Sequence, residues 1–274
     1  MASDKPIAIA LIGFGEVGQR FSTDLMVGDD AVIAAYDIVF DDPTQAPERL
    51  AKADRLGVRP AASAAAACKN AGVVISAVTA DAAEGVAEAA RHYLTPGQIF
   101  FDVNSAAPST KQRAARHVEA SGAHYVEGAV MGPVRVPGIA VPILAGGPAA
   151  EETSIVLNSL GFNLTPVAAE YGKASAIKLC RSIVIKGLEA LLVDCAAAVR
   201  SAGIDREVYG SLAETFPSID WAQLADAMAD RVATHGVRRS AEMREAADML
   251  SEMGLDASLV RAVADAQARG ARNT

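Results

Sequence analysis

The chain has 274 residues, a net charge of −8 and 51% hydrophobic residues, so it can bury a substantial core in one large or two modest domains. The acidic balance and the lack of any basic cluster argue against nucleic acid and against an anionic membrane surface, and they favour a small-molecule partner. The three cysteines and four histidines show no spacing typical of a disulfide framework or a metal site. Without an apolar run of membrane-spanning length or a signal-peptide pattern in residues 1–6, we expect a cytoplasmic protein.

The first recognisable motif lies between an apolar run at residues 6–12, which predicts a buried strand, and a helical pattern at residues 16–25. The sequence GFGEVG places glycines at positions 13, 15 and 18 on this strand-to-helix turn. In dinucleotide-binding proteins the first glycine makes the turn, the second admits the pyrophosphate, and the third lets helix and strand pack closely. The phosphates then bind the backbone N–H groups at the positive end of the helix dipole. The cofactor contacts expected on this turn are Gly13, Phe14, Gly15, Glu16, Val17 and Gly18; the alternative is a structural turn that binds nothing.

The second predicted strand begins the segment AVIAAYDIVF, residues 31–40, and ends at Asp37. This position is close to the spacing of about twenty residues at which an acidic side chain accepts hydrogen bonds from the adenosine ribose. A carboxylate there repels the 2′-phosphate of NADP, and residues 38–42 contain no Arg or Lys that could neutralise it. We therefore expect NAD rather than NADP. The alternative is that Asp37 only caps a turn.

The remaining pattern divides the chain in two. Strand-like runs at residues 73–78, 98–103 and 141–147 alternate with alanine-rich helical stretches, and residues 60–68 also favour a helix. From about residue 170 only helical patterns follow, at residues 171–202, 205–216, 220–233, 240–254 and 256–270. The sequence predicts an α/β N-terminal Rossmann domain with a doubly wound, mostly parallel sheet at residues 1–167, then an all-α C-terminal domain at residues 168–274.

The long helix expected at residues 171–202 is mostly apolar but carries a polar stripe. Lys178, Arg181, Ser182 and Lys186 are spaced i, i+3, i+4 and i+8, so they share one face of a helix. Such a stripe is either a solvated face or part of a site.

Four segments together indicate a family. GFGEVG, DVNSAAPST, EGAVMGPV followed by PILAGG, and YGKASAIKLCRS occur in that order along nearly the whole chain. This combination resembles the β-hydroxyacid dehydrogenase family, which includes 3-hydroxyisobutyrate and 6-phosphogluconate dehydrogenases, and it looks closest to a poorly characterised phosphogluconate-dehydrogenase-like branch. The resemblance implies an NAD-dependent oxidoreductase that acts on a hydroxy-acid-like or related alcohol substrate. It also implies that Lys178 is the catalytic residue, as a general acid and base.

The resemblance extends to other positions on the Rossmann domain. It implies that Val78, Thr79 and Asn104 border the cofactor and that Ser105 lies near its nicotinamide end; the alternative is ordinary polar loop residues at strand ends. The family's substrate-binding turn, typically Ser-Gly-Gly, corresponds to Met131, Gly132 and Pro133. This departure removes a hydroxyl donor and a backbone N–H.

The helical domain also departs from the family pattern. Ser182 stands where the family has an asparagine, and Arg238 and Arg239 stand in place of a Lys-Asp pair. We expect Arg181, Ser182, His235 and Arg239 to contact the substrate, because arginines bind carboxylates bidentately and His235 lies one turn before Arg239. Surface charge is the alternative for these charged residues. The resemblance further implies a homodimer formed through the C-terminal helices. An imine reductase and a non-catalytic dinucleotide-binding sensor stay open as other functions.

Overall fold

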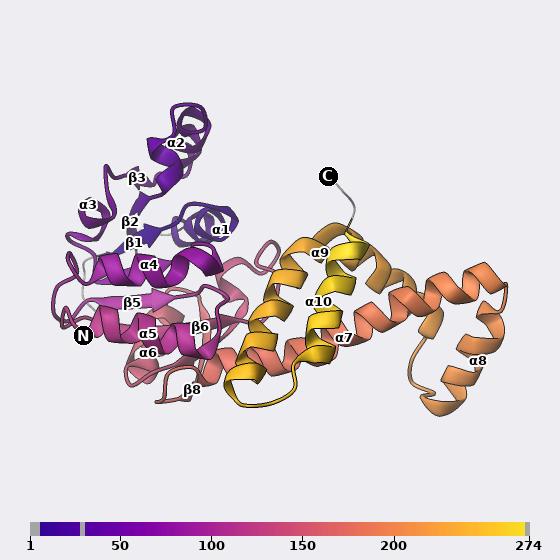
Figure 1. The fold of residues 1–274 in the computed structure, drawn as a ribbon. Coiled ribbons are helices and arrows are strands. Elements are labelled where there is room, and N and C mark those ends of the chain that lie inside the picture. The colour runs from indigo at the N-terminus through magenta and orange to yellow at the C-terminus, as the bar shows by residue number, and fades with distance from the viewer. Residues whose placement is uncertain (1–5, 28–30, 272–274) are drawn as a thin grey trace. The chain divides into compact units, whose positions relative to one another are not determined.

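The computed structural model describes residues 6–27 and 31–271 (Figure 1). The chain divides into two compact units, Met1–Lys178 and Leu179–Thr274. The first unit contains the sheet, and the second is helical. The predicted fold class, a doubly wound α/β domain followed by an all-α region, is therefore confirmed.

The described residues of the first unit form one eight-stranded sheet with the order β3-β2-β1-β4-β5-β6-β7-β8. Its strands are β1 (Ile7–Ile12), β2 (Ala31–Tyr36), β3 (Arg59–Pro60), β4 (Val73–Ser76), β5 (Ile99–Asp102), β6 (His124–Val130), β7 (Pro142–Gly146) and β8 (Asn163–Ala168). Neighbouring strands are parallel except for the β6 and β7 pair. The strand order moves outward from β1 in both directions, so a crevice is expected at the carboxyl ends of β1 and β4.

The helices of this unit connect successive strands. They are α1 (Glu16–Leu25), α2 (Ala46–Arg55), α3 (Ala64–Cys68), α4 (Ala80–Ala90), α5 (Pro108–Glu119) and α6 (Ala150–Ser159), with 3₁₀ helices η1 (Ile38–Asp41) and η2 (Gly138–Ala140). Strand residues alternate between the two faces of the sheet. Ile9 and Leu11 pack in one core with Phe21 of α1, whereas Ala10 packs in the other core with Ala87 of α4. Helices α4 and α5 lie side by side (Figure 1).

Several element boundaries differ from those expected from the sequence. The strand expected at residues 73–78 ends earlier, at Ser76. The strands expected at residues 98–103 and 141–147 are each shorter by one residue at both ends. The helix expected at residues 60–68 begins only after Ser63, because the Ser63 Oγ accepts a hydrogen bond from the Ala66 N–H at 3.1 Å and so caps α3. Strands β3, β6 and β8 were not expected. Glu127 and Gly128 interrupt the apolar pattern of β6, and β8 is an edge strand with mostly exposed residues.

Four helices follow the sheet. They are α7 (Lys173–Ala202), which begins in the first unit, α8 (Asp205–Thr215), α9 (Trp221–Glu252) and α10 (Ser258–Gly270). The segments predicted at residues 220–233 and 240–254 belong to the single helix α9. Gly236 lies between these two segments. A side chain does not fit at this position, because a Cβ there would come within 2.3 Å of the Gln267 carbonyl oxygen. The glycine therefore permits close packing of α9 against α10 (Figure 1) rather than ending a helix.

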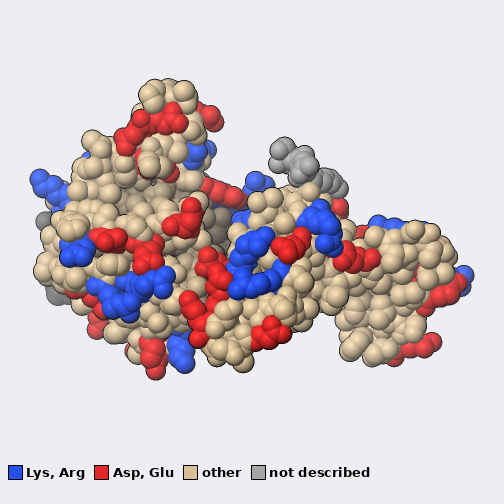
Figure 2. All heavy atoms as spheres, in the orientation of Figure 1, with Lys and Arg blue, Asp and Glu red and all other residues tan. Residues whose placement is uncertain are grey.

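Charges of both signs lie beside one another on the face shown in Figure 2. Between α9 and α10, Arg244 pairs with Asp265 at 3.2 Å and Arg261 pairs with Asp248 at 3.3 Å. Exposed pairs of this kind contribute about 0–1 kcal/mol each. Among the described residues, no helix combines the length and apolar character required to cross a membrane, and no group of His, Cys, Asp and Glu side chains has the arrangement of a metal site.

Candidate functional site

The glycine turn at residues 13–18 joins β1 to α1. Gly13 has φ +95°, and a Cβ on it would lie 2.3 Å from the Ala77 carbonyl oxygen. A Cβ on Gly18 would lie 2.4 Å from the Gly13 carbonyl oxygen, whereas one on Gly15 would meet nothing within 4 Å. Gly15 is also the N-cap residue of α1 and has no side chain that could cap the helix, so the first N–H groups of α1 are available to a ligand. Two glycines thus serve packing and the third leaves open space, an arrangement that fits a dinucleotide pyrophosphate.

Asp37 lies directly after β2 and is bonded to the glycine turn. Its carboxylate accepts hydrogen bonds from the Phe14 N–H at 2.6 Å and from the Val39 N–H at 2.9 Å. Asp37 therefore does cap a turn, since it is the N-cap residue of η1. Its bond to Phe14 also fixes the backbone of the glycine turn. The Phe14 side chain is fully buried, so only its backbone can contact a cofactor.

Asn104 joins the ends of β4 and β5. Its Oδ1 accepts a hydrogen bond from the Val78 N–H at 2.7 Å, and its Nδ2 donates to the Ser76 Oγ at 3.0 Å. Val78 and Thr79 lie beyond the end of β4, which stops at Ser76, and Thr79 is the N-cap residue of α4. The strand end expected at Val78 is therefore a loop, held by the buried Asn104 side chain.

A fully buried polar cluster lies beneath this loop. The Lys111 Nζ lies 2.9 Å from the Asp102 Oδ1, and the Tyr125 hydroxyl donates to the Asp102 Oδ2 at 2.6 Å. Burial raises the pKa of the Tyr125 phenol, and the Asp102 charge adds to this shift. Asp102 also accepts a hydrogen bond from the Asn104 N–H at 2.9 Å, so the cluster fixes the start of the loop. Sequence reasoning missed it, although a carboxylate at the end of the apolar run QIFFDV was a signal.

The structure brings Ser105 and Lys178 together within the first unit. The Lys178 Nζ donates a hydrogen bond to the Ser105 Oγ at 2.5 Å. The start of α7 is fixed by the fully buried Glu127, whose two carboxylate oxygens accept hydrogen bonds from the Gly172 and Ser175 N–H groups at 2.6 Å each. A negative charge at the N-terminus of a helix also complements the helix dipole. Glu127 was likewise missed, and it determines where Lys178 lies relative to the sheet.

The turn after β6 contains the three residues expected at the substrate. The Met131 N–H donates to the Pro142 carbonyl oxygen at 2.9 Å, which continues the pairing of β6 with β7. Gly132 and Pro133 are exposed. A Cβ on Gly132 would make only an ordinary contact, with Val141 at 3.7 Å, so the turn does not require a glycine there.

The polar stripe on α7 continues into the helical unit, where its residues separate. Ser182 and Lys186 are buried and Arg181 is exposed. The Ser182 Oγ donates to the Glu242 Oε1 at 2.6 Å, and the Lys186 Nζ lies 2.5 Å from the same oxygen. Burial lowers the pKa of Lys186, and the charge of Glu242 opposes this shift. Ser182 is thus committed to a pair within its own unit.

A fully buried carboxylate, Glu189, lies one helical turn after Lys186 on α7. The Arg239 Nη1 donates to the Glu189 Oε2 at 2.8 Å, and the Gln267 Nε2 lies 3.3 Å from the same oxygen. Glu189 is fully buried, so Arg239 compensates an interior charge. His235 and Arg238, by contrast, are exposed on α9. Of the residues on α9 that were expected to contact the substrate, Arg239 is therefore bonded to a buried carboxylate, whereas His235 is exposed.

The parallel sheet, its glycine turn and the open start of α1 define a Rossmann protein of the dinucleotide-binding class. The family described as the NAD binding domain of 6-phosphogluconate dehydrogenase matches residues 8–168, and a domain of unknown function, DUF1932, matches residues 200–270. The chain belongs to this NAD-binding family. The resemblance to the β-hydroxyacid dehydrogenases is confirmed.

Three solved structures are similar over almost the whole chain. A conserved hypothetical protein from Sinorhizobium meliloti 1021 is 39% identical, with a TM-score of 0.84, over 97% of this chain and 88% of that one. A conserved protein of unknown function, described as structurally similar to 3-hydroxyacid dehydrogenases, is 30% identical, with a TM-score of 0.78, over 96% of each chain. The 3-hydroxyisobutyrate dehydrogenase of Mycobacterium tuberculosis is 19% identical, with a TM-score of 0.79, over 96% of this chain and 93% of that one, and shows the fold alone.

Proposed function

We propose that this protein is an NAD-dependent oxidoreductase that transfers a hydride between the nicotinamide and a hydroxy-acid-like or related alcohol substrate. The observation that carries the proposal is the 2.5 Å hydrogen bond from Lys178 to Ser105. Ser105 lies three residues after the end of β5, and both residues belong to the same unit as the glycine turn. An amine at this edge of the sheet has the chemistry that alcohol oxidation requires, because it can hold or release the hydroxyl proton.

The reaction divides between cofactor and protein. The glycine turn and Asp37 would hold NAD, which would supply the hydride acceptor for the carbinol carbon of the substrate. The neutral Lys178 amine takes the hydroxyl proton in the oxidation, and the Lys178 ammonium returns it to the carbonyl oxygen in the reverse direction. Ser105 orients the amine through their hydrogen bond. Asn104 and Asp102 position the loop that carries Ser105.

The remaining roles follow from the same assignment. Asp37 would bind the adenosine ribose beside the glycine turn, which favours NAD. Arg181 and His235 are the exposed polar candidates for binding a substrate carboxylate. Ser182 and Arg239 are weaker candidates, since each is already bonded to a glutamate.

A spectrophotometric screen tests this proposal. The purified protein is mixed with NAD or its reduced form and with β-hydroxy acids, alcohols, ketones and ketone–amine mixtures, and the absorbance of the reduced nicotinamide is followed. We expect oxidation of at least one hydroxy compound. Reduction confined to the ketone–amine mixtures would instead favour an imine reductase. Dinucleotide binding without turnover of any compound would favour a sensor.

Two alanine substitutions in the glycine turn should affect different properties, one the NAD affinity and the other the stability. We expect Gly15→Ala to leave stability almost unchanged, because its methyl group meets no atom within 4 Å, but to weaken NAD binding at least about tenfold by filling the pyrophosphate space. We expect Gly18→Ala to cost about 1–3 kcal/mol of stability, because its methyl group would overlap the Gly13 carbonyl oxygen. NAD titration and urea unfolding of both variants check this. Normal NAD affinity in Gly15→Ala would contradict the assigned role of the turn.

We also propose a homodimer through the C-terminal helices. Ile177, Val184 and Leu191 are spaced by seven residues on α7 and are 46%, 68% and 68% exposed, which makes an apolar stripe typical of helix–helix contacts. We expect the double variant Val184→Lys, Leu191→Lys to sediment as a monomer and the unsubstituted protein to sediment as a dimer. Leu259→Lys, at a 72% exposed position on α10, serves as the control. A monomeric, active unsubstituted protein would reject the dimer.

A further inference from the structure

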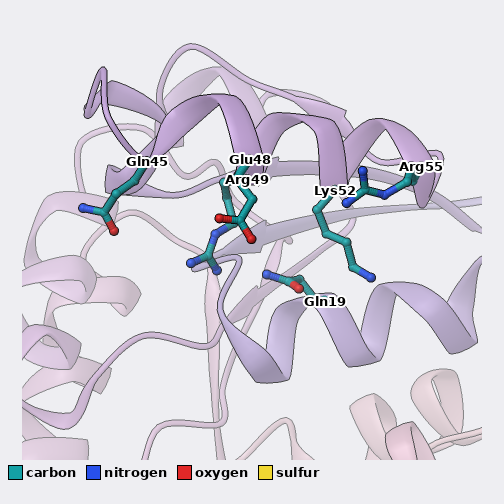
Figure 3. A pocket seen from close by; sticks show the side chains of 6 residues that line it. All are labelled: Gln19, Gln45, Glu48, Arg49, Lys52 and Arg55. Carbon is teal, nitrogen blue, oxygen red and sulfur yellow. The ribbon is translucent and has the colours of Figure 1, made fainter.

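A basic groove lies between α1 and α2, close to the glycine turn. We call it the anion groove; it has a volume of about 480 Å³ and is lined by Gln19, Gln45, Glu48, Arg49, Lys52 and Arg55. Gln45 is the N-cap residue of α2 and the other four lie on that helix at helical spacing, so they share the face that is turned toward Gln19 on α1. Figure 3 shows Arg49 and Lys52 extending from α2 toward Gln19.

The groove carries an excess of positive charge. Three of the lining residues are cationic and one, Glu48, is anionic. With the described residues as possible partners, Lys52 and Arg55 form no ion pair. Arg49 donates one hydrogen bond to a backbone carbonyl and keeps its positive charge. A cationic groove with amide donors beside it favours an anion with several acceptor oxygens.

The groove is bonded directly to the glycine turn. The Arg49 Nη1 and the Gln19 Nε2 both donate to the Phe14 carbonyl oxygen, at 2.8 and 2.9 Å. Asp37 holds the N–H of the same residue at 2.6 Å. The groove therefore begins at the residue that is bonded to Asp37, where the adenosine ribose is expected. Because both Asp37 oxygens accept backbone N–H groups, part of its negative charge is compensated, which reduces its repulsion of a nearby anion.

We propose that the anion groove binds a phosphomonoester dianion, carried either by the 2′-oxygen of the adenosine ribose of NADP or by a free phosphate. A phosphate group is about doubly charged at pH 7 and offers three acceptor oxygens, which suits the Lys52 ammonium and the Arg55 guanidinium. The first source rests on the proposed dinucleotide binding, whereas the second does not. The groove would thus extend cofactor use from NAD to NADP, or it would place a phosphate-responsive site beside the cofactor.

Calorimetric titration of the full-length protein tests the proposal with three probes: NAD, NADP and inorganic phosphate. The variant is Lys52→Gln, Arg55→Gln. The matched control is Lys69→Gln, Arg91→Gln, which removes the same charge at two exposed positions outside the groove. A 2′-phosphate in the groove predicts that the variant loses at least about tenfold in NADP affinity while its NAD affinity stays within about twofold. A free phosphate predicts that the unsubstituted protein and the control bind inorganic phosphate and that the variant does not.

An unchanged ratio of NADP to NAD affinity in the variant, together with no binding of inorganic phosphate by the unsubstituted protein, would overturn the proposal. Failure of the dinucleotide binding on which the proposed function rests gives a different result. In that case neither dinucleotide would bind any of the proteins, while binding of inorganic phosphate would still report on the groove.

Discussion

Lys178→Ala should abolish turnover while leaving NAD affinity within about twofold of the unsubstituted protein. The Lys178 amine is the group assigned to proton transfer, and loss of a general acid or base typically lowers the rate by about 10²–10⁴-fold. The glycine turn and Asp37, which would bind the dinucleotide, follow β1 and β2, whereas Lys178 contacts Ser105 in the segment after β5. Initial-rate measurements on the substrate found by the screen, together with NAD titration, separate the two effects.

Two companion variants make the interpretation specific. Lys178→Arg keeps a positive charge, but a guanidinium stays protonated near neutral pH and cannot act as a base, so we expect turnover to remain at least about a hundredfold below normal. Lys173→Ala, at the exposed first residue of α7, should retain full activity. Undiminished turnover in Lys178→Ala would refute the assignment of the lysine. High activity in Lys178→Arg would show that the reaction needs the positive charge at this position but not proton transfer by the side chain.

The second large effect concerns stability. We expect Lys111→Ala to lower the free energy of unfolding by about 3–5 kcal/mol, because it leaves the Asp102 carboxylate buried without its cation. The Lys111 and Asp102 side chains are 0% and 1% exposed and lie 2.9 Å apart. A typical domain is stable by only about 5–15 kcal/mol, so this loss is a large part of the total. Urea unfolding followed by circular dichroism measures it.

A matched control lies on the same helix. Arg113 of α5 pairs with Glu84 at 2.8 Å, and the two side chains are 40% and 35% exposed. Arg113→Ala should therefore cost no more than about 1 kcal/mol. A loss below about 1 kcal/mol in Lys111→Ala as well would mean that the buried pair contributes little. Both substitutions truncate a long cation on α5 that is paired with a carboxylate, and the two pairs differ strongly in burial.

The sequence was most informative where local chemistry determines structure. Helix α1 has the predicted ends, Glu16 and Leu25, and the glycines at 13 and 18 have the steric surroundings that the motif implies. Prediction failed where long-range contacts decide. Gly236 resembles a helix break in the sequence, but it lies inside α9 because α10 packs against it. Strand β8, with four exposed residues and Pro166, lacks the apolar run that identifies a buried strand.

The candidate site shows the same division. Lys178 and Ser105 came from the family resemblance, and the structure finds them in hydrogen-bond contact. Asp102 and Glu127 were missed, because a charged residue in an apolar strand has no visible partner until the fold supplies one. The cations of the anion groove were missed for a related reason. Residues 38–42 contain no Arg or Lys, whereas Arg49 reaches the glycine turn from the following helix.

The anchoring of α7 by Glu127 has a consequence for how such proteins diversify. Lys178 is the last residue of the sheet-containing unit, and the carboxylate that fixes the start of its helix comes from β6. The position of the lysine relative to the sheet is therefore set within this unit. We expect that replacing the residues after Lys178, which include the rest of α7, leaves its contact with Ser105 in place. A chimera joined after Leu179 would keep the lysine proposed to transfer the proton and take the following helical residues from a relative.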